Sequence, residues 1–212
     1  MDLLKKLTDR ELERAYETVF REAFPPEELK PLSVIRRMRD EGQYEPWGLF
    51  REGEPVGYVC CWLDRPYILI DYLCVDRRVR NGGIGTAVLE KMRAAYPADT
   101  VFIGEVEAPT GDPVADGIVY RRLDFYRRNG AKTASYDAAA FGVHYKTIYW
   151  AEGPVDEAEI MARHDGFYRR NFPPERYAAA IQIPLAPGEK PYPRAVWDES
   201  PAVKTESKEK AL

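Results

Sequence analysis

Cysteine and histidine are both scarce in this chain. Its 212 residues include three cysteines and two histidines. Cys60, Cys61 and Cys74 are odd in number and lack the CxxC spacing, which predicts small, reduced core residues instead of a disulfide framework. His144 and His164 both lie far from the cysteines in sequence, so we expect no zinc or other metal site.

Long apolar runs and an excess of positive charge are missing as well. No stretch approaches the roughly 18 apolar residues that a membrane span needs, and the N-terminal MDLLKKLTDR lacks the apolar core of a secretory signal. The formal net charge of -4 argues against a protein that coats nucleic acid. We therefore expect a cytoplasmic protein that acts on small molecules, with neither a membrane nor nucleic acid as a partner.

What the chain does contain is enough apolar material for a core, 45% of its residues. Near the N-terminus, apolar residues at helical spacing predict a helix. It starts at a capping box of Thr8 and Glu11 and must end before Pro25. A second helix is expected over residues 33–41, and both helices are expected to precede the first strand.

Three strands are predicted next. Residues 44–50 and 56–63 form a hairpin signal in which Gly53 supplies the turn. Residues 67–75 are almost continuously apolar, which is typical of a central strand covered on both faces. Asp71 interrupts this strand, and a buried carboxylate is unfavourable unless it is paired or used in chemistry.

The middle of the chain predicts a parallel crossover. A strand, a glycine-rich loop, a helix and a strand follow one another within about 40 residues, as in a βαβ unit. The elements predicted from here on are a helix over 84–96, a strand over 100–109, a helix over 118–132 after a polar loop, a strand over 142–150 and a helix over 156–170.

This pattern predicts an α/β (α+β) fold: a mixed sheet with antiparallel N-terminal strands, a central βαβ crossover and flanking helices. We expect one domain over residues 1–150 and an accessory helical segment over 151–184 packed on it. From residue 185 the composition turns to Pro, Glu, Lys and Ser, which predicts a flexible tail over 185–212.

The stretch RNGGIGTAV, residues 80–88, combines glycines with the start of a helix. The first four N–H groups of a helix lack partners, and a glycine-rich entry lets a phosphate approach them. A Walker loop is excluded because no Gly-Lys-Ser/Thr occurs. The dinucleotide fingerprint fits poorly, because six residues separate the glycines from the strand and Val88 occupies the position of the third glycine. A nicotinamide-dependent oxidoreductase stays a weaker alternative.

Three motifs resemble the GNAT acetyltransferase superfamily. LCVDRRVRNGGIGTAVLEKM is similar to its motif A, with Arg80, Gly83 and Gly85 in the positions of Arg/Gln-x-x-Gly-x-Gly/Ala. FYRRNG, residues 125–130, resembles a second motif, and the Glu-Val pair within residues 104–107 resembles a third.

The resemblance implies acetyl-CoA as cosubstrate. Backbone groups of Leu73 and Val75 would pair with the pantetheine arm as an extra strand does. Arg77 and Arg78, like Arg80, lie where a CoA phosphate could be neutralised. The pyrophosphate would lie on the backbone amides of Arg80, Asn81, Gly82, Gly83, Ile84, Gly85 and Thr86.

The same resemblance implies N-acetylation of a small-molecule or peptide amine. Glu105 matches the base, with a pKa raised by burial, and Tyr126 matches the acid that protonates the CoA thiolate. Glu107 and Asp71 are the alternative bases. Glu107, together with the loop residues Asp112 and Asp116, is placed to attract a cationic amine. A non-catalytic acyl-CoA-binding module is the second reading, and the assembly state, a homodimer included, is left open.

Overall fold

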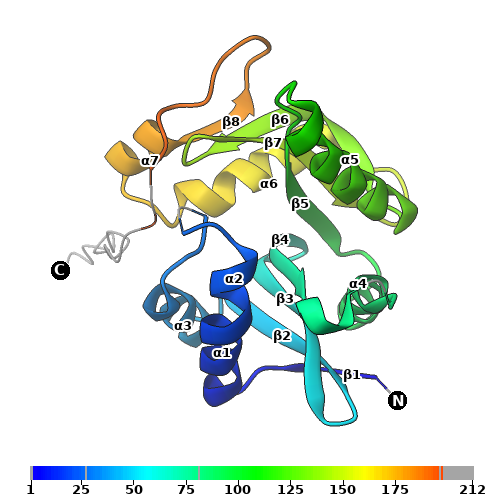
Figure 1. Ribbon diagram of the computed structural model, residues 1–212. Helices are drawn as coiled ribbons and strands as arrows, with labels where there is room; N and C mark the ends of the chain where they lie inside the picture. Colours follow the sequence, from blue (N-terminus) through cyan, green and yellow to red (C-terminus); the bar gives the residue numbers. More distant parts are fainter. Residues whose placement is uncertain (1, 27, 81, 196, 198–212) are drawn as a thin grey trace, which may run out of the picture.

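A single mixed sheet with helices on both faces forms the protein, described here by a computed structural model that covers residues 2–26, 28–80, 82–195 and 197 (Figure 1). The strand order is β1-β2-β3-β4-β5-β7-β6-β8. Every neighbouring pair is antiparallel except β4 and β5, which are parallel. The predicted mixed α/β fold with one central crossover is confirmed.

The elements, in chain order, are β1 (Leu3–Lys6), α1 (Asp9–Ala15), the π-helical turn η1 (Tyr16–Phe20), α2 (Arg21–Ala23), α3 (Leu32–Asp40), β2 (Tyr44–Arg51), β3 (Glu54–Asp64), β4 (Tyr67–Val75), the 3-10 turn η2 (Arg77–Val79), α4 (Ile84–Ala94), β5 (Val101–Glu107), α5 (Pro113–Arg128), β6 (Lys132–Ala140), β7 (Val143–Trp150), α6 (Glu157–Arg169), α7 (Pro174–Ala180) and β8 (Ile181–Leu185).

Two layers of core hold the helices on the sheet. On one face, α1, α3 and α6 bury residues such as Leu12, Ile35 and Phe167 against the strands. On the other face, α4 packs through Val88 and Met92, and α5 is added beside it. All three cysteines are buried free thiols, as predicted. In the described part of the chain, no helix is long and apolar enough to cross a membrane.

The prediction that two helices precede the first strand is wrong at the N-terminus. β1 comes first and pairs with the edge of β2, with Leu3 opposite Phe50. A four-residue strand at the edge of a sheet need not alternate apolar and polar residues, so no sequence pattern predicts this strand. The helix that follows begins at the predicted capping box of Thr8 and Glu11.

A bulge lies in the middle of the central strand. In the ladder with β3, Cys60 lies opposite Tyr72. Its neighbour Cys61 lies opposite Ile70, so Asp71 is an extra residue in β4. A bulge bends a strand and increases its local twist. β4 and β5 pair only up to Ile70, which lies beside Gly104, and from the bulge onward the two parallel strands separate.

The C-terminal third departs most from the prediction. α5 begins at Pro113, inside the segment expected to be a loop, because Asp112 caps it by accepting from the backbone of Val114 and Ala115. β6 and β8 were not predicted, since KTASYDAAA consists mostly of small or polar residues. β8 pairs with β6, so residues 151–184 are not helical throughout and end in a strand of the main sheet.

Part of the expected tail is ordered against the domain. Leu185 still belongs to β8, and the backbone N–H of Tyr192 bonds to Gln182 at 2.9 Å. The ring of Trp197 lies 4.9 Å from those of both Phe141 and Phe172. Residue 196 and residues 198–212 of the predicted tail lie outside the described residues.

Candidate active site

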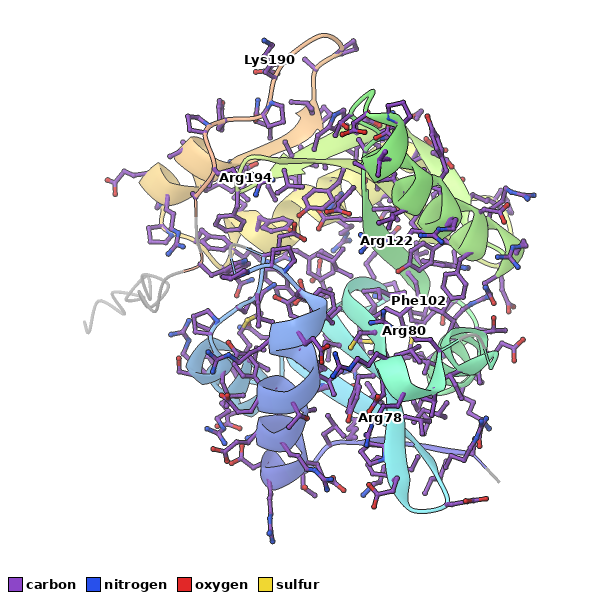
Figure 2. All side chains as sticks on the ribbon, viewed as in Figure 1. Arg78, Arg80, Phe102, Arg122, Lys190 and Arg194 are labelled. Atoms are coloured by element: carbon purple, nitrogen blue, oxygen red, sulfur yellow. The ribbon has the colours of Figure 1, made fainter. Side chains whose placement is uncertain are left out.

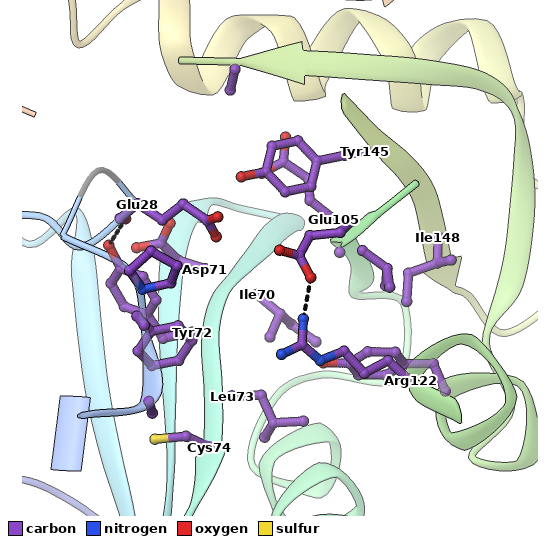
Figure 3. A pocket seen from close by; sticks show the side chains of 18 of the residues that line it. Glu28, Ile70, Asp71, Tyr72, Leu73, Cys74, Glu105, Arg122, Tyr145 and Ile148 are labelled. Carbon is purple, nitrogen blue, oxygen red and sulfur yellow. Dashed lines mark hydrogen bonds and ion pairs between the residues drawn. The ribbon is translucent and has the colours of Figure 1, made fainter. Parts of the chain in front are cut away.

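The separation of β4 and β5 opens a cavity of about 660 Å³ between the two halves of the sheet. Figure 3 shows it from close by, with β4 on one side and residues of β5, β7 and α5 on the other. Arg80 and Arg122, one above the other in Figure 2, both line it. Of the predicted site residues, the cavity brings together Leu73, Val75, Arg80, Glu105 and Tyr126.

The backbone of β4 turns the polar groups of two residues toward this opening. Asp76 donates its N–H to the carbonyl of Val56 at 3.1 Å, which makes that pair a hydrogen-bonded one in the antiparallel ladder. Hydrogen-bonded and non-hydrogen-bonded pairs alternate, so Leu73 and Val75 point their N–H and C=O groups away from β3, toward the gap. Consistently, Arg80 Nε donates to the Val75 carbonyl at 3.3 Å.

The glycine loop leads into α4 with bare amides. Gly83 is the N-cap residue at φ 73°, and no side chain caps the helix. The first bond into this turn, at 3.0 Å, comes from Ala87 to the Gly83 carbonyl, so the N–H groups before Ala87 have no helical partner. Those amides belong to the predicted residues Ile84, Gly85 and Thr86. Gly82 lies in the same loop, and Asn81 lies outside the described residues.

Gly85 also has a packing role. A Cβ at this position would come within 3.0 Å of the Phe125 ring. Any other residue would have to push the Phe125 ring back by a few tenths of an ångström, so glycine favours this close approach of α5 to the first turn of α4, where the two predicted motifs meet.

The three arginines near the loop have different partners. Arg77 forms an ion pair with Glu22, and Arg78 with Asp76. Arg80 has no carboxylate partner among the described residues and bonds only to the Val75 carbonyl. Arg80 is therefore the arginine of this group whose charge is available to an anion.

Tyr126 lies on α5 at the wall of the cavity. Its ring packs edge-on against that of Trp150, with centroids 5.8 Å apart. Burial raises the pKa of Tyr126 to about 12, although Arg122 nearby acts in the opposite direction. With this pKa the hydroxyl is protonated at neutral pH. It has no hydrogen-bond partner in the described part of the chain, so it is available to a ligand.

Glu105 is held by two side chains of α6. His164 Nε2 lies 2.9 Å from Oε1, and the Tyr168 hydroxyl donates to Oε2 at 2.8 Å. Burial raises the pKa of Glu105, but the hydrogen bonds from His164 and Tyr168, together with the electrostatic effects of His164 and Lys30, outweigh it, so the pKa is lowered. The expectation of a raised pKa is wrong, because the sequence did not reveal these two donors.

The other two candidate bases already have cationic partners. Lys30 Nζ lies 2.6 Å from Asp71 Oδ1, and both side chains are buried; Tyr44 donates to the other oxygen. Glu107 forms an ion pair with Arg122, drawn as the dashed line at Arg122 in Figure 3.

Of the three carboxylates, Glu105 is therefore the one without a lysine or arginine partner among the described residues. Sequence reasoning missed Lys30 and Tyr168. His164 at helical spacing on an apolar face was a visible but ambiguous signal.

The loop acids do not line the cavity. Asp112 caps α5, and Asp116 accepts from the backbone of Thr110 and Gly111 at 2.7 and 2.8 Å. Their role is to start α5. The described residues contain no group of three or more His, Cys, Asp or Glu side chains that could hold a metal ion.

Comparisons with known proteins agree with this geometry. The family model described as "Acetyltransferase (GNAT) family" matches residues 10–109. No curated protein matches the chain. A solved GNAT-family protein from Bacteroides thetaiotaomicron superposes with a TM-score of 0.63 at 21% identity, over 76% of this chain and 94% of that one.

Two further solved structures have the same fold. The ribosomal-protein-S18-alanine N-acetyltransferase from Escherichia coli gives a TM-score of 0.53 at 17% identity, over 74% of this chain and 98% of that one. An aminoglycoside 6'-N-acetyltransferase complexed with coenzyme A gives 0.52 at 11% identity, over 73% and 99%. At these identities the likeness concerns the fold. Together, the family model, the fold and the three motifs agree that residues 10–109 form a GNAT acetyltransferase domain.

Proposed function

We propose that the protein transfers an acetyl group from acetyl-CoA, the cosubstrate of its family, to an amine. The observation that carries the proposal is the divergence of β4 and β5 at Asp71, which leaves a cavity lined by Val75, Arg80 and Glu105; Arg80 belongs to the loop that leads to the bare amides at the start of α4. This arrangement offers a phosphate site, an unpaired strand edge and a carboxylate around one cavity.

The cosubstrate would bind in two parts. Its pyrophosphate would accept from the N–H groups between Gly82 and Thr86, helped by the positive end of the α4 dipole and by Arg80. Its pantetheine arm would pair with the free backbone groups of Leu73 and Val75. The thioester would then lie in the gap between β4 and β5, with Tyr126 on the wall.

The reaction is a direct transfer. The amine nitrogen attacks the thioester carbonyl carbon, a C–N bond forms, and the C–S bond breaks. Glu105, through a water molecule, first takes the proton of the ammonium group, which frees the nitrogen lone pair. Tyr126 then gives its proton to the sulfur, and the proton that the nitrogen loses after the attack restores Tyr126. A carboxylate in the cavity without a lysine or arginine partner among the described residues favours an acceptor that arrives as an ammonium ion. We include small-molecule and peptide amines as acceptors.

Binding of CoA tests the first half of this proposal. Arg80→Ala is expected to weaken CoA binding about 10-fold in calorimetry, because one charge-assisted contact to phosphate is lost. Arg77→Ala removes the same charge nearby, but Arg77 already binds Glu22, so its effect is expected to be smaller. CoA at 100 times its dissociation constant should add about 2.7 kcal/mol to the stability of the wild type. A shift with NAD and none with CoA would overturn the proposal.

Turnover tests the second half. Tyr126→Phe is expected to lower kcat about 10-fold in an assay of CoA release over an amine panel. The loss is moderate because a thiol has a pKa near 8.5, so its thiolate leaves fairly easily without an acid. Tyr120→Phe, on an exposed tyrosine of the same helix, is the control. Equal rates for both variants and the wild type would remove the acid role, and CoA binding without any turnover would favour a binding module.

A further inference from the structure

A buried histidine joins three elements behind Glu105. His164 lies on α6 and is fully buried, at 0% exposure. Its Nε2 lies 2.9 Å from Glu105 Oε1, and its Nδ1 lies 3.1 Å from the hydroxyl of Tyr136 on β6. One turn further along α6, Tyr168 donates to the second oxygen of Glu105 at 2.8 Å.

These contacts fix the place of one proton on His164. An ionised Glu105 can only accept, so Nε2 must carry a proton toward it. Nδ1 and the Tyr136 hydroxyl share a second hydrogen bond, in which the hydroxyl can donate or accept. Each oxygen of Glu105 therefore receives one hydrogen bond from α6, which fixes the plane of the carboxylate. The side chain of Glu105 keeps 14% of its surface exposed and lines the cavity.

We propose that His164, oriented by Tyr136, is a positioning residue that holds the Glu105 carboxylate ionised and aimed at the acceptor amine. The inference rests on the proposed function and goes beyond it, since α6 lies outside the segment that matches the family model. His164 does not line the cavity, so it acts through Glu105 and does not touch the substrate.

Other charged and titratable groups also face this carboxylate. Lys30, from the loop before α3, favours the charged form of Glu105. Tyr136 and Tyr145, from β6 and β7, interact with it electrostatically, and Tyr168 interacts with both Glu105 and Asp71 of β4. Lys30 Nζ forms its ion pair with Asp71 Oδ1, at 2.6 Å. The side chains that donate hydrogen bonds directly to Glu105 are those of His164 and Tyr168.

Three histidine variants test the proposal kinetically. His164→Phe keeps a ring but removes the donor, and we expect kcat to fall about 10- to 100-fold, part of what a general base supplies. In the pH profile of kcat/KM for this variant, the acid limb, where activity falls as Glu105 is protonated, should move to higher pH. Burial raises the pKa of Glu105, and the hydrogen bond from residue 164 no longer opposes that rise. His164→Gln keeps an N–H donor and should recover most of the rate and the original limb. His144→Phe is the control, since His144 is bonded to Asp137 and does not line the cavity.

Two results would overturn the proposal: an acid limb in His164→Phe that coincides with that of His144→Phe, or a Gln variant no better than the Phe variant. Should His164→Phe fail to fold, Tyr168→Phe removes the second donor with the loss of one oxygen and should move the limb in the same direction. An unmoved limb in that variant would equally contradict the proposal.

Nuclear magnetic resonance gives a readout that does not require activity. With two histidines in the chain, ¹⁵N-labelled histidine yields two assignable side chains. We expect His164 to carry a proton on Nε2, and Glu105→Gln to disturb that signal but not the signal of His144. An Nε2 that carries no proton would contradict the proposal. If the resonance spectra show the His164–Glu105 hydrogen bond but no amine is acetylated, the proposed function is wrong, while the hydrogen bonding described for His164 is correct.

Discussion

Replacement of Glu105 by glutamine is expected to lower kcat for acetyl transfer by about 10²- to 10⁴-fold, the usual contribution of a general base. Glutamine has nearly the same shape but cannot take up a proton. The lowered pKa of Glu105 means that the wild type carries its charge from mildly acidic pH upward, so the loss should be seen across the neutral range. Steady-state CoA release with the best amine of the panel measures it.

Glu107→Gln is the matched control for this variant. It removes a carboxylate two residues further along the same strand, and that carboxylate is already paired with Arg122. We expect its kcat to stay within about threefold of the wild type, far from the loss of a general base. CoA binding should persist in both variants. A large loss in Glu107→Gln with none in Glu105→Gln would assign the base to Glu107 and contradict our assignment.

Lys30→Met is expected to destabilise the fold by about 3–5 kcal/mol, the usual effect of removing one partner from a buried ion pair. The side chains of Lys30 and Asp71 are only 2% and 7% exposed, and their charged atoms lie 2.6 Å apart. Without Lys30, Asp71 keeps the Tyr44 hydroxyl as its one side-chain hydrogen-bond partner among the described residues. The ammonium also lies 4.9 Å and 4.1 Å from the ring centroids of Trp62 and Trp197, and these contacts are lost as well.

Chemical denaturation with circular dichroism measures this effect. The double variant Lys30→Met/Asp71→Asn should recover a large part of the lost stability, because no uncompensated charge is then buried. Arg21→Met is the control, since it breaks an exposed pair with Glu17 and should barely move the unfolding midpoint. If Lys30→Met were as stable as Arg21→Met, Asp71 would not depend on Lys30.

Much of the fold follows from local patterns. The spacing of apolar residues predicts α4 and α6, and Gly83, at φ 73°, fills the one backbone position at the start of α4 that favours glycine. The alternation of β2 and β3 and the continuous apolar run of β4 are equally local. These signals depend on residues within one or two turns of each other, so a single sequence contains them in full.

β6 and β8 could not be predicted in this way. Ala138 and Ala139 of β6 are almost fully buried, but alanine has little strand preference, and β8 is five residues long and includes Pro184. Both strands form because neighbouring strands and α6 cover them. Their stability comes from pairing partners that are distant in sequence, and no local pattern records those.

The sequence by itself determined the glycine loop, the central crossover and the set of carboxylates able to act as a base. Only the tertiary structure decided among Asp71, Glu105 and Glu107, which look alike along the chain. Their partners Lys30, His164 and Arg122 lie 41, 59 and 15 residues away, and which of them reaches which carboxylate depends on how β4 and β5 separate and where α5 and α6 pack. A charge is neutralised or left available by its neighbours in space, and those neighbours exist only once the chain has folded.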